Sequence, residues 1–232
     1  MAESDTSRQA IIFVNGECDA ETLATLPLNS NSVLIAVDGG LKHVKTINRE
    51  PDYLIGDMDS VDRADHARLV QSRRTTVIPH PPEKDSTDLE LTLEFAATLE
   101  LSSVVLVGVM GGRLDQALAN ILLLGGSVWP YTIDIVSADG NGYLLTPQRA
   151  FGRALKSGTV LSLLPLSNDV DGVTTEGLYY PLRNARLPFG SSLGISNEVN
   201  GTVTSVSLKT GRLLLVLPHH RSGGDGAIQA MA

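Results

Sequence analysis

The strongest constraint on the fold is a series of short apolar runs, most of which lead into glycines or acidic residues. Segments with helical spacing of apolar residues lie between most of these runs. Such an alternation is typical of buried parallel strands joined by crossover helices. The runs occupy residues 10–14, 32–37, 53–56, 75–79 and 104–109. We therefore predict an α/β fold whose N-terminal part, residues 1–147, is a doubly wound and mostly parallel sheet.

The pattern changes after residue 139. Short segments of alternating apolar and polar residues follow, such as 158–165, 201–206 and 212–217, and Gly, Pro, Asn and Asp separate them. This texture predicts an antiparallel β-sandwich over residues 148–218. The last segment, 219–232, is rich in Gly and small residues, and we expect it to be disordered.

Acidic residues follow several of the predicted strands. In an open parallel sheet, ligands bind at the carboxyl ends of the strands. Asp57 and Asp59 lie one residue apart, so an extended backbone would point both to one face, about 7 Å from each other. Carboxylates gathered at one edge repel one another unless a cation lies between them, and one divalent metal ion can bind several carboxylates at once. The acidic residues expected at this edge are Asp38, Asp57, Asp59, Asp85, Asp88 and Asp115.

Groups suited to phosphate accompany these acids. Lys84 and Arg113 supply positive charge. The glycine pairs at 39–40 and 111–112 permit close approach of the backbone, and helices that start after them offer N–H groups to anions. Thr87 and Glu90 have the spacing of a capping box at the start of one such helix. The residues alone indicate a metal-dependent enzyme, with Mg²⁺, acting on a phosphate-bearing substrate.

Composition excludes several other classes. A formal net charge of −8 without a basic cluster argues against a nucleic-acid surface. No apolar run is long enough to span a membrane, and residues 1–10 lack the apolar core of a signal peptide. The single cysteine, Cys18, excludes an internal disulfide and fits a cytoplasmic protein. Neither a P-loop nor a dinucleotide fingerprint occurs.

Four motifs in order resemble the thiamine pyrophosphokinase family: Asp38-Gly39-Gly40, the segment 56–60 (GDMDS), the segment 84–88 (KDSTD) and the segment 111–116 (GGRLDQ). The segments 177–180 (GLYY) and 195–198 (ISNE) extend the similarity, which covers about residues 30–217. The resemblance implies a Mg²⁺-dependent, homodimeric enzyme that transfers pyrophosphate from ATP to thiamine and releases AMP. It also implies a catalytic α/β domain at 1–147 and a thiamine-binding sandwich at 148–218, with each site shared between subunits.

The resemblance also implies roles for individual residues. Catalytic roles fall on Asp57, Asp59, Asp88 and Asp115, of which Asp57, Asp59 and Asp88 would hold Mg²⁺ or orient the thiamine hydroxyl. ATP would contact Asp38, Gly39, Gly40, Lys84, Asp85, Gly112, Arg113 and Gln116. Thiamine would contact Tyr180, Ser196 and Asn197. Two positions depart from the commonest bacterial pattern: Gln116 stands in place of His, and Leu193 in place of Arg.

Other functions compete with this one. A pyrophosphokinase for another alcohol, such as a hydroxymethylpterin, would use the same residues. A metal-dependent glycosyltransferase would use Asp57 and Asp59 on a nucleotide sugar, but it leaves the motif at 84–88 and the sandwich without a purpose. A non-catalytic thiamine or nucleotide sensor has no need of the acidic residues that are all present here.

Overall fold

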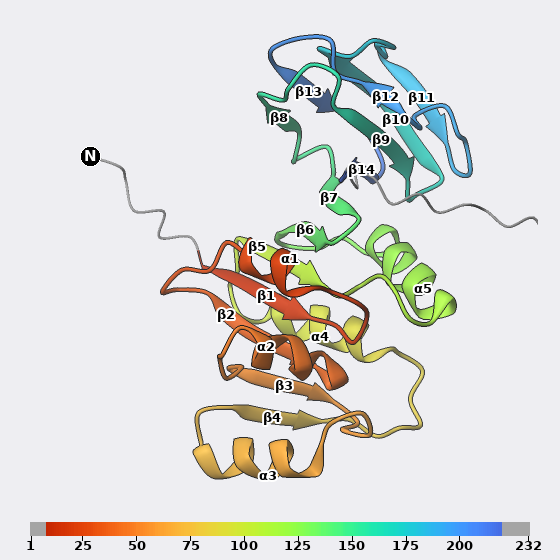
Figure 1. Cartoon of the computed structure of the whole chain (residues 1–232). Helices are drawn as coiled ribbons and strands as arrows, with labels where there is room; N and C mark the ends of the chain where they lie inside the picture. The colour runs from red at the N-terminus through yellow and green to blue at the C-terminus, as the bar shows by residue number, and fades with distance from the viewer. Residues whose placement is uncertain (1–7, 220–232) are drawn as a thin grey trace, which may run out of the picture.

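The computed structural model describes residues 8–219 and is built on one ten-stranded sheet (Figure 1). The sheet has the strand order β12-β9-β14-β7-β6-β5-β1-β2-β3-β4. Its parallel half consists of β1 (Gln9–Phe13), β2 (Val33–Val37), β3 (Tyr53–Gly56), β4 (Thr76–Pro79), β5 (Ser103–Val107) and β6 (Thr132–Ser137). The predicted parallel sheet is confirmed.

Helices cover both faces of the parallel half. They are α1 (Ala20–Ala24), α2 (Leu41–Thr46) with the preceding 3₁₀ turn η1 (Asp38–Gly40), α3 (Arg63–Ser72), α4 (Asp88–Ala97) and α5 (Leu114–Gly126). Successive residues of β1 serve opposite faces: Ala10 and Ile12 join the core that contains residues of α4 and α5, whereas Ile11 and Phe13 join the core that contains residues of α1, α2 and α3. Burial on both faces explains why these strands read as continuous apolar runs.

The order of the strands reverses between β1 and β5. The chain proceeds outwards from β1 to β4 and then crosses back through α4 to β5, which pairs with β1 on its other side. The connections after β1 and β5 therefore lead to helices on opposite faces of the sheet, α1 and α5, at the point where open α/β sheets bind their ligands.

The second half of the chain forms the predicted sandwich. One layer is the far end of the main sheet: β7 (Gly140–Leu145), β14 (Leu213–Pro218), β9 (Val160–Pro165) and β12 (Asn197–Glu198). The other is a four-stranded sheet in the order β11 (Ala185–Pro188), β10 (Asp169–Glu176), β13 (Thr204–Ser207) and β8 (Phe151–Arg153). Buried side chains from both sheets form one apolar core.

The main sheet joins the two halves. β14 lies between β7 and β9, and β7 pairs with β6 of the first half. Leu213 and Leu215 face the sandwich core, whereas Leu214 between them joins the core beneath α4 and α5. A single strand thus contributes to both cores.

Two further findings concern sequence expectations. The predicted disordered segment 219–232 lies outside the described residues except for His219, whose backbone N–H donates to the carbonyl of Asp139. None of the helices within residues 8–219 has the length and apolar character needed to cross a bilayer.

Candidate active site

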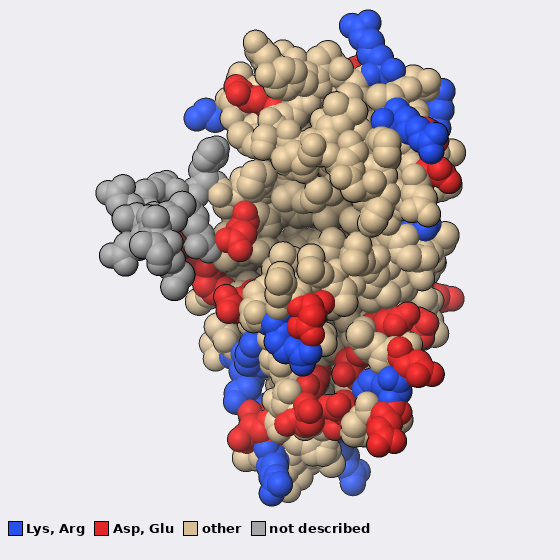
Figure 2. Space-filling model, turned by 90° about the vertical axis from the view of Figure 1, so that its right-hand side faces the viewer, with Lys and Arg blue, Asp and Glu red and all other residues tan. Residues whose placement is uncertain are grey.

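A cavity of about 560 Å³ opens at the carboxyl edge of the parallel sheet. It is lined by the loops after β1, β2, β3 and β5 and by the first turns of α4 and α5. This edge lies on the side of the molecule that Figure 2 faces, and acidic side chains gather over its lower part. Of the predicted site residues, it is lined by Asp38, Asp57, Asp59, Asp88, Gly112, Arg113 and Gln116.

Three carboxylates meet in this cavity. One oxygen each from Asp38, Asp57 and Asp59 lie within 4.8 Å of one another. The backbone that brings them together is not the extended segment predicted from the sequence, because Met58 between the two acids has φ 66°. In the resulting turn the Asp59 N–H donates to Oδ1 of Asp57 at 3.1 Å. The turn, rather than a shared strand face, directs both carboxylates toward Asp38.

Asp38 is the most buried of the three acids. It follows β2 with φ 46°, and its Oδ1 atom is buried with no hydrogen-bond partner within the described part of the chain. Burial raises the pKa of the Asp38 carboxyl, and the charges of Asp59 and Asp57 add to the effect. An unpaired buried oxygen beside two further carboxylates matches the oxygen ligands that Mg²⁺ takes. The residues therefore fit the metal.

Asp88 lines the same cavity and has a cationic partner. It is the first residue of α4, and its Oδ1 atom forms an ion pair with Nζ of Lys84 at 2.6 Å. Thr87 caps the helix by accepting a hydrogen bond from the Glu90 N–H at 3.2 Å, as the capping-box spacing predicts. The capped start of α4 fixes the position of Asp88. Asp85 lies in the exposed loop before it and does not line the cavity.

The loop between β5 and α5 also lines the cavity. Gly111 and Gly112 have φ values of 86° and 66°, which favour glycine. Arg113 follows and pairs with Asp115 through two hydrogen bonds. This pair raises the pKa of Arg113 and lowers that of Asp115. Both side chains are exposed. Arg113 lines the cavity, and its guanidinium is paired with the Asp115 carboxylate there.

Gly39 and Gly40 do not line the cavity but pack beneath it. A Cβ on Gly40 would lie 1.9 Å from the carbonyl oxygen of Phe13, and one on Gly39 would lie 2.5 Å from the side chain of Asn15. These glycines let the start of α2 rest on the end of β1. Their place in the structure is therefore explained by packing.

Two residues of the cavity were not singled out in the sequence. Asn15 follows β1, and Asn120 lies buried on α5, where its Nδ2 donates to the Val109 carbonyl at 3.1 Å. Each carries a weak signal: Asn15 ends an apolar run, and Asn120 interrupts the apolar part of the helix that follows Gln116.

The predicted thiamine-contacting residues lie on the sandwich, and none of them lines the cavity. The Tyr179 and Tyr180 rings are exposed and meet edge to face at 4.9 Å. The side chain of Asn197 is buried: its Oδ1 accepts from the Tyr180 N–H, and its Nδ2 donates to the Tyr180 carbonyl at 2.8 Å. Asn197 thus fixes the loop that presents Tyr180. Ser196 is exposed beside it, with φ 56°.

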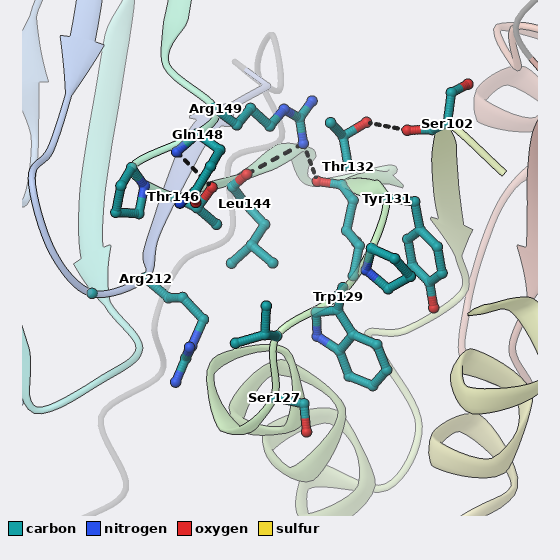
Figure 3. A pocket seen from close by; sticks show the side chains of 15 residues that line it. Ser102, Ser127, Trp129, Tyr131, Thr132, Leu144, Thr146, Gln148, Arg149 and Arg212 are labelled. Atoms are coloured by element: carbon teal, nitrogen blue, oxygen red, sulfur yellow. Dashed lines mark hydrogen bonds between the residues drawn. The ribbon is translucent and has the colours of Figure 1, made fainter. Parts of the chain in front are cut away.

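A second cavity, of about 540 Å³, lies at the opposite edge of the sheet (Figure 3). It contains none of the predicted site residues. Its Arg149 has three partners: Nη1 donates to the carbonyls of Ile133 and Leu144, and Nη2 pairs with Asp134 at 2.6 Å. We interpret this place as a structural junction between β6, β7 and the start of the sandwich.

Comparison with known proteins agrees with this arrangement. Residues 25–130 match the family model "Thiamin pyrophosphokinase, catalytic domain", and residues 148–215 match "Thiamin pyrophosphokinase, vitamin B1 binding domain". The chain is 28% identical to the thiamine pyrophosphokinase of Bacillus subtilis over 189 residues, which cover 81% of this chain and 88% of that one. It is 25% identical to thiamin pyrophosphokinase 1 of Caenorhabditis elegans, with 91% and 89% covered.

Solved structures give the same result. The crystal structure of the Bacillus subtilis thiamine pyrophosphokinase superposes with a TM-score of 0.76 at 25% identity, covering 91% of this chain and 99% of that one. The enzyme from Geobacillus thermodenitrificans gives 0.74 at 26% identity, with 92% and 99% covered.

The fold and the acidic cavity thus define an enzyme with an α/β half and a sandwich half joined by one sheet. The chain belongs to the thiamine pyrophosphokinase family, and the resemblance predicted from the four motifs is confirmed.

Proposed function

We propose that this protein transfers the pyrophosphoryl group of ATP to the hydroxyl of thiamine, with Mg²⁺, giving thiamine diphosphate and AMP. The observation that carries this proposal is one cavity lined by the Asp38–Asp57–Asp59 cluster, by Asp88 and by the glycine loop before Arg113. Family membership supports the substrates. In this proposal residues 1–147 bind ATP and metal, and residues 148–218 contribute the thiamine contacts.

The three clustered acids are the proposed metal ligands. Asp57 and Asp59 were expected in this role, and the position of Asp38 adds a third carboxylate, whereas Asp88 is occupied by Lys84. When bound, Mg²⁺ would neutralise phosphate charge and help hold the reacting groups in line. The unpaired Oδ1 of Asp38 gains a partner in that state.

The remaining residues act on the substrates directly. In the proposed reaction the thiamine hydroxyl attacks the β-phosphorus, the bond to the α-phosphate oxygen breaks, and AMP leaves. Asp88 accepts the hydroxyl proton, because Lys84 and the capped start of α4 hold its carboxylate at the cavity wall. Arg113 contacts the phosphates, and Asp115 orients its guanidinium. Catalysis thus consists mainly of positioning and charge stabilisation.

We propose further that the active unit is a homodimer. Tyr180 and Ser196 are exposed and lie outside the acidic cavity of their own chain, so a partner is needed if they are to reach a site. α5 exposes an apolar stripe of Leu114, Leu118 and Leu122, each more than half exposed. Figure 2 shows a broad, largely uncharged hollow above the acidic region on the side where α5 lies. Exposed apolar surface of this kind supports an interface with a second copy.

The reaction is tested by incubating the protein with ATP, Mg²⁺ and a panel of alcohols, and reading products by phosphorus NMR. We expect AMP and thiamine diphosphate with thiamine. Product from a hydroxymethylpterin but not from thiamine would overturn the acceptor, and tighter binding of nucleotide sugars than of ATP would overturn the reaction class.

The thiamine contact is tested by kinetics of Tyr180→Ala with each substrate varied in turn. A ring that stacks on the thiazolium adds a cation–π contribution of about 0.5–2 kcal/mol. We therefore expect the thiamine KM to rise more than the ATP KM. An unchanged thiamine KM would contradict the role of Tyr180.

The shared site is tested by mixing two impaired proteins at a thiamine concentration below the raised KM of Tyr180→Ala. If Tyr180 completes the partner's site, a hybrid of Asp57→Asn and Tyr180→Ala subunits contains one site with both lesions and one with neither. Activity should then rise above that of either protein alone after subunit exchange. Exchange demonstrated by native mass spectrometry without any recovery of activity would place both residues in the site of one chain.

A further inference from the structure

His43 is a buried titratable residue that the proposed reaction does not use. It lies on α2, on the side of the sheet opposite α4 and α5, and the residue is 4% exposed. Its Nε2 atom is 3.0 Å from the carbonyl oxygen of Gly16, in the turn after β1. Because a carbonyl only accepts, Nε2 carries the proton and donates. Burial lowers the pKa of His43, which agrees with a neutral ring.

The preceding residue, Lys42, holds the same turn. Its Nζ donates to the Asn15 carbonyl at 2.8 Å and to Oδ1 of the Asn15 side chain at 3.0 Å. Two consecutive residues of α2 therefore hold two consecutive peptide carbonyls, those of Asn15 and Gly16. This contact is possible because Gly39 and Gly40 allow α2 to rest on the end of β1.

The turn is also joined to the loop after β5. The Gly16 N–H donates to the Gly108 carbonyl at 2.8 Å, and the Glu17 N–H donates to the Met110 carbonyl at 2.7 Å. The His43 ring lies against Gly108, since a Cβ there would be 3.0 Å from Nε2. α2, the turn after β1 and the loop after β5 thus form one hydrogen-bonded unit behind the acidic cavity.

Asn15 is the member of this unit that reaches the substrate side. It lines the cavity together with Gly16, Gly111 and Gly112. The Asn15 amide oxygen accepts a hydrogen bond from Lys42, and the amide NH₂ has no hydrogen-bond partner within residues 8–219. An amide fixed in this way offers two donors to phosphate oxygens.

We propose that Lys42 and His43 are positioning residues for ATP, which hold the Asn15–Gly16 turn so that the Asn15 amide donates to the phosphates. The inference rests on the proposed reaction with ATP. Its consequence is selective: losing either contact loosens the turn and weakens ATP binding, but leaves the thiamine contacts on the sandwich unchanged.

The test compares ATP and thiamine KM values for Lys42→Met and His43→Leu. Each variant removes hydrogen bonds worth about a two- to twelve-fold change in affinity apiece, so the ATP KM should rise by that factor while the thiamine KM stays constant. His43→Gln keeps a donor near the Nε2 position, so its ATP KM should lie close to that of the wild type. Lys45→Met is the matched control, because Lys45 lies on the same helix but pairs with Asp65 at the surface.

Three outcomes decide the proposal. An ATP KM equal to that of the wild type in folded Lys42→Met and His43→Leu proteins would overturn it. Equal rises in both KM values, or no rescue by His43→Gln, would show a general structural role and also overturn it. If the wild type forms no AMP, the proposed reaction fails separately, and titration calorimetry with ATP and Mg²⁺ on the same variants still tests the positioning of the turn. Should His43→Leu not fold, Lys42→Met and His43→Gln carry the same comparison.

Discussion

The Nζ atom of Lys84 lies 2.6 Å from Oδ1 of Asp88, four residues further along the chain at the start of α4. Both side chains are largely buried, with exposed fractions of 14% and 23%. An ion pair in such a place is weakly screened by solvent, so each partner depends on the other. The pair connects a residue of the loop before α4 to the proposed proton acceptor.

Lys84→Met should therefore reduce turnover by about ten-fold or more, which corresponds to a charged hydrogen bond of about 1.5–3 kcal/mol. If Lys84 acts through Asp88, the double variant Lys84→Met/Asp88→Asn should be no slower than Asp88→Asn alone. Steady-state kinetics of the four proteins check this. Fully additive losses would show that Lys84 contacts the substrate independently.

Asp57→Asn and Asp59→Asn should each abolish most turnover with Mg²⁺ while the protein stays folded. Each variant removes a proposed metal ligand but also removes a charge that repels the other two acids. The melting temperature without Mg²⁺ should therefore not fall. Wild-type rates in both variants would disprove the metal assignment, and Asp62→Ala, which only removes the cap of α3, is the control for a purely structural loss.

Arg149→Met should destabilise the protein without altering the ATP or thiamine KM. It leaves the carbonyls of Ile133 and Leu144 and the carboxylate of Asp134 without their donor at a place distant from the acidic cavity. A cost of about 1.5–3 kcal/mol is expected for charged hydrogen bonds, which lowers the melting temperature by about 3–12 °C for a chain of this size. Differential scanning calorimetry measures the melting temperature. Arg186→Met, at an exposed ion pair with Asp169, should change it little.

The thiol of Cys18 should react slowly with iodoacetamide at pH 8. Burial raises the pKa of Cys18 to about 11, and the neighbouring charge of Asp19 adds to this. Because the thiolate is the nucleophile, the rate should be about 100-fold below that of a free cysteine and should rise as the pH approaches 11. Mass spectrometry of the modified protein gives the rate, and denaturant should restore fast labelling. Rapid reaction of the native protein at pH 8 would contradict the expectation.

Much of this architecture was predictable because local sequence and tertiary structure agree. Each run such as 10–14 is apolar throughout because β1 is covered on both faces, and the cap at Thr87 is a local interaction. The turn at Met58 was not predictable, since a positive φ at a non-glycine residue depends on the surrounding structure. The sequence predicted that Asp38, Asp57 and Asp59 share this edge of the sheet, but the spacing of the residues does not show that these three cluster within 4.8 Å. The role of Asn197 beneath Tyr180 does not appear in the spacing either.

The position of β14 in the middle of the main sheet affects how this protein is made. Until Leu213–Pro218 leaves the ribosome, β7 and β9 have no neighbour between them, and each presents an unpaired edge rich in apolar side chains. Edges of this kind invite pairing with other chains. The core beneath α4 and α5, to which Leu214 contributes, is therefore completed only after the second half of the chain is synthesised. A premature stop codon upstream of Leu213 would remove an interior strand of the sheet, and the truncated product would be directed to aggregation or degradation.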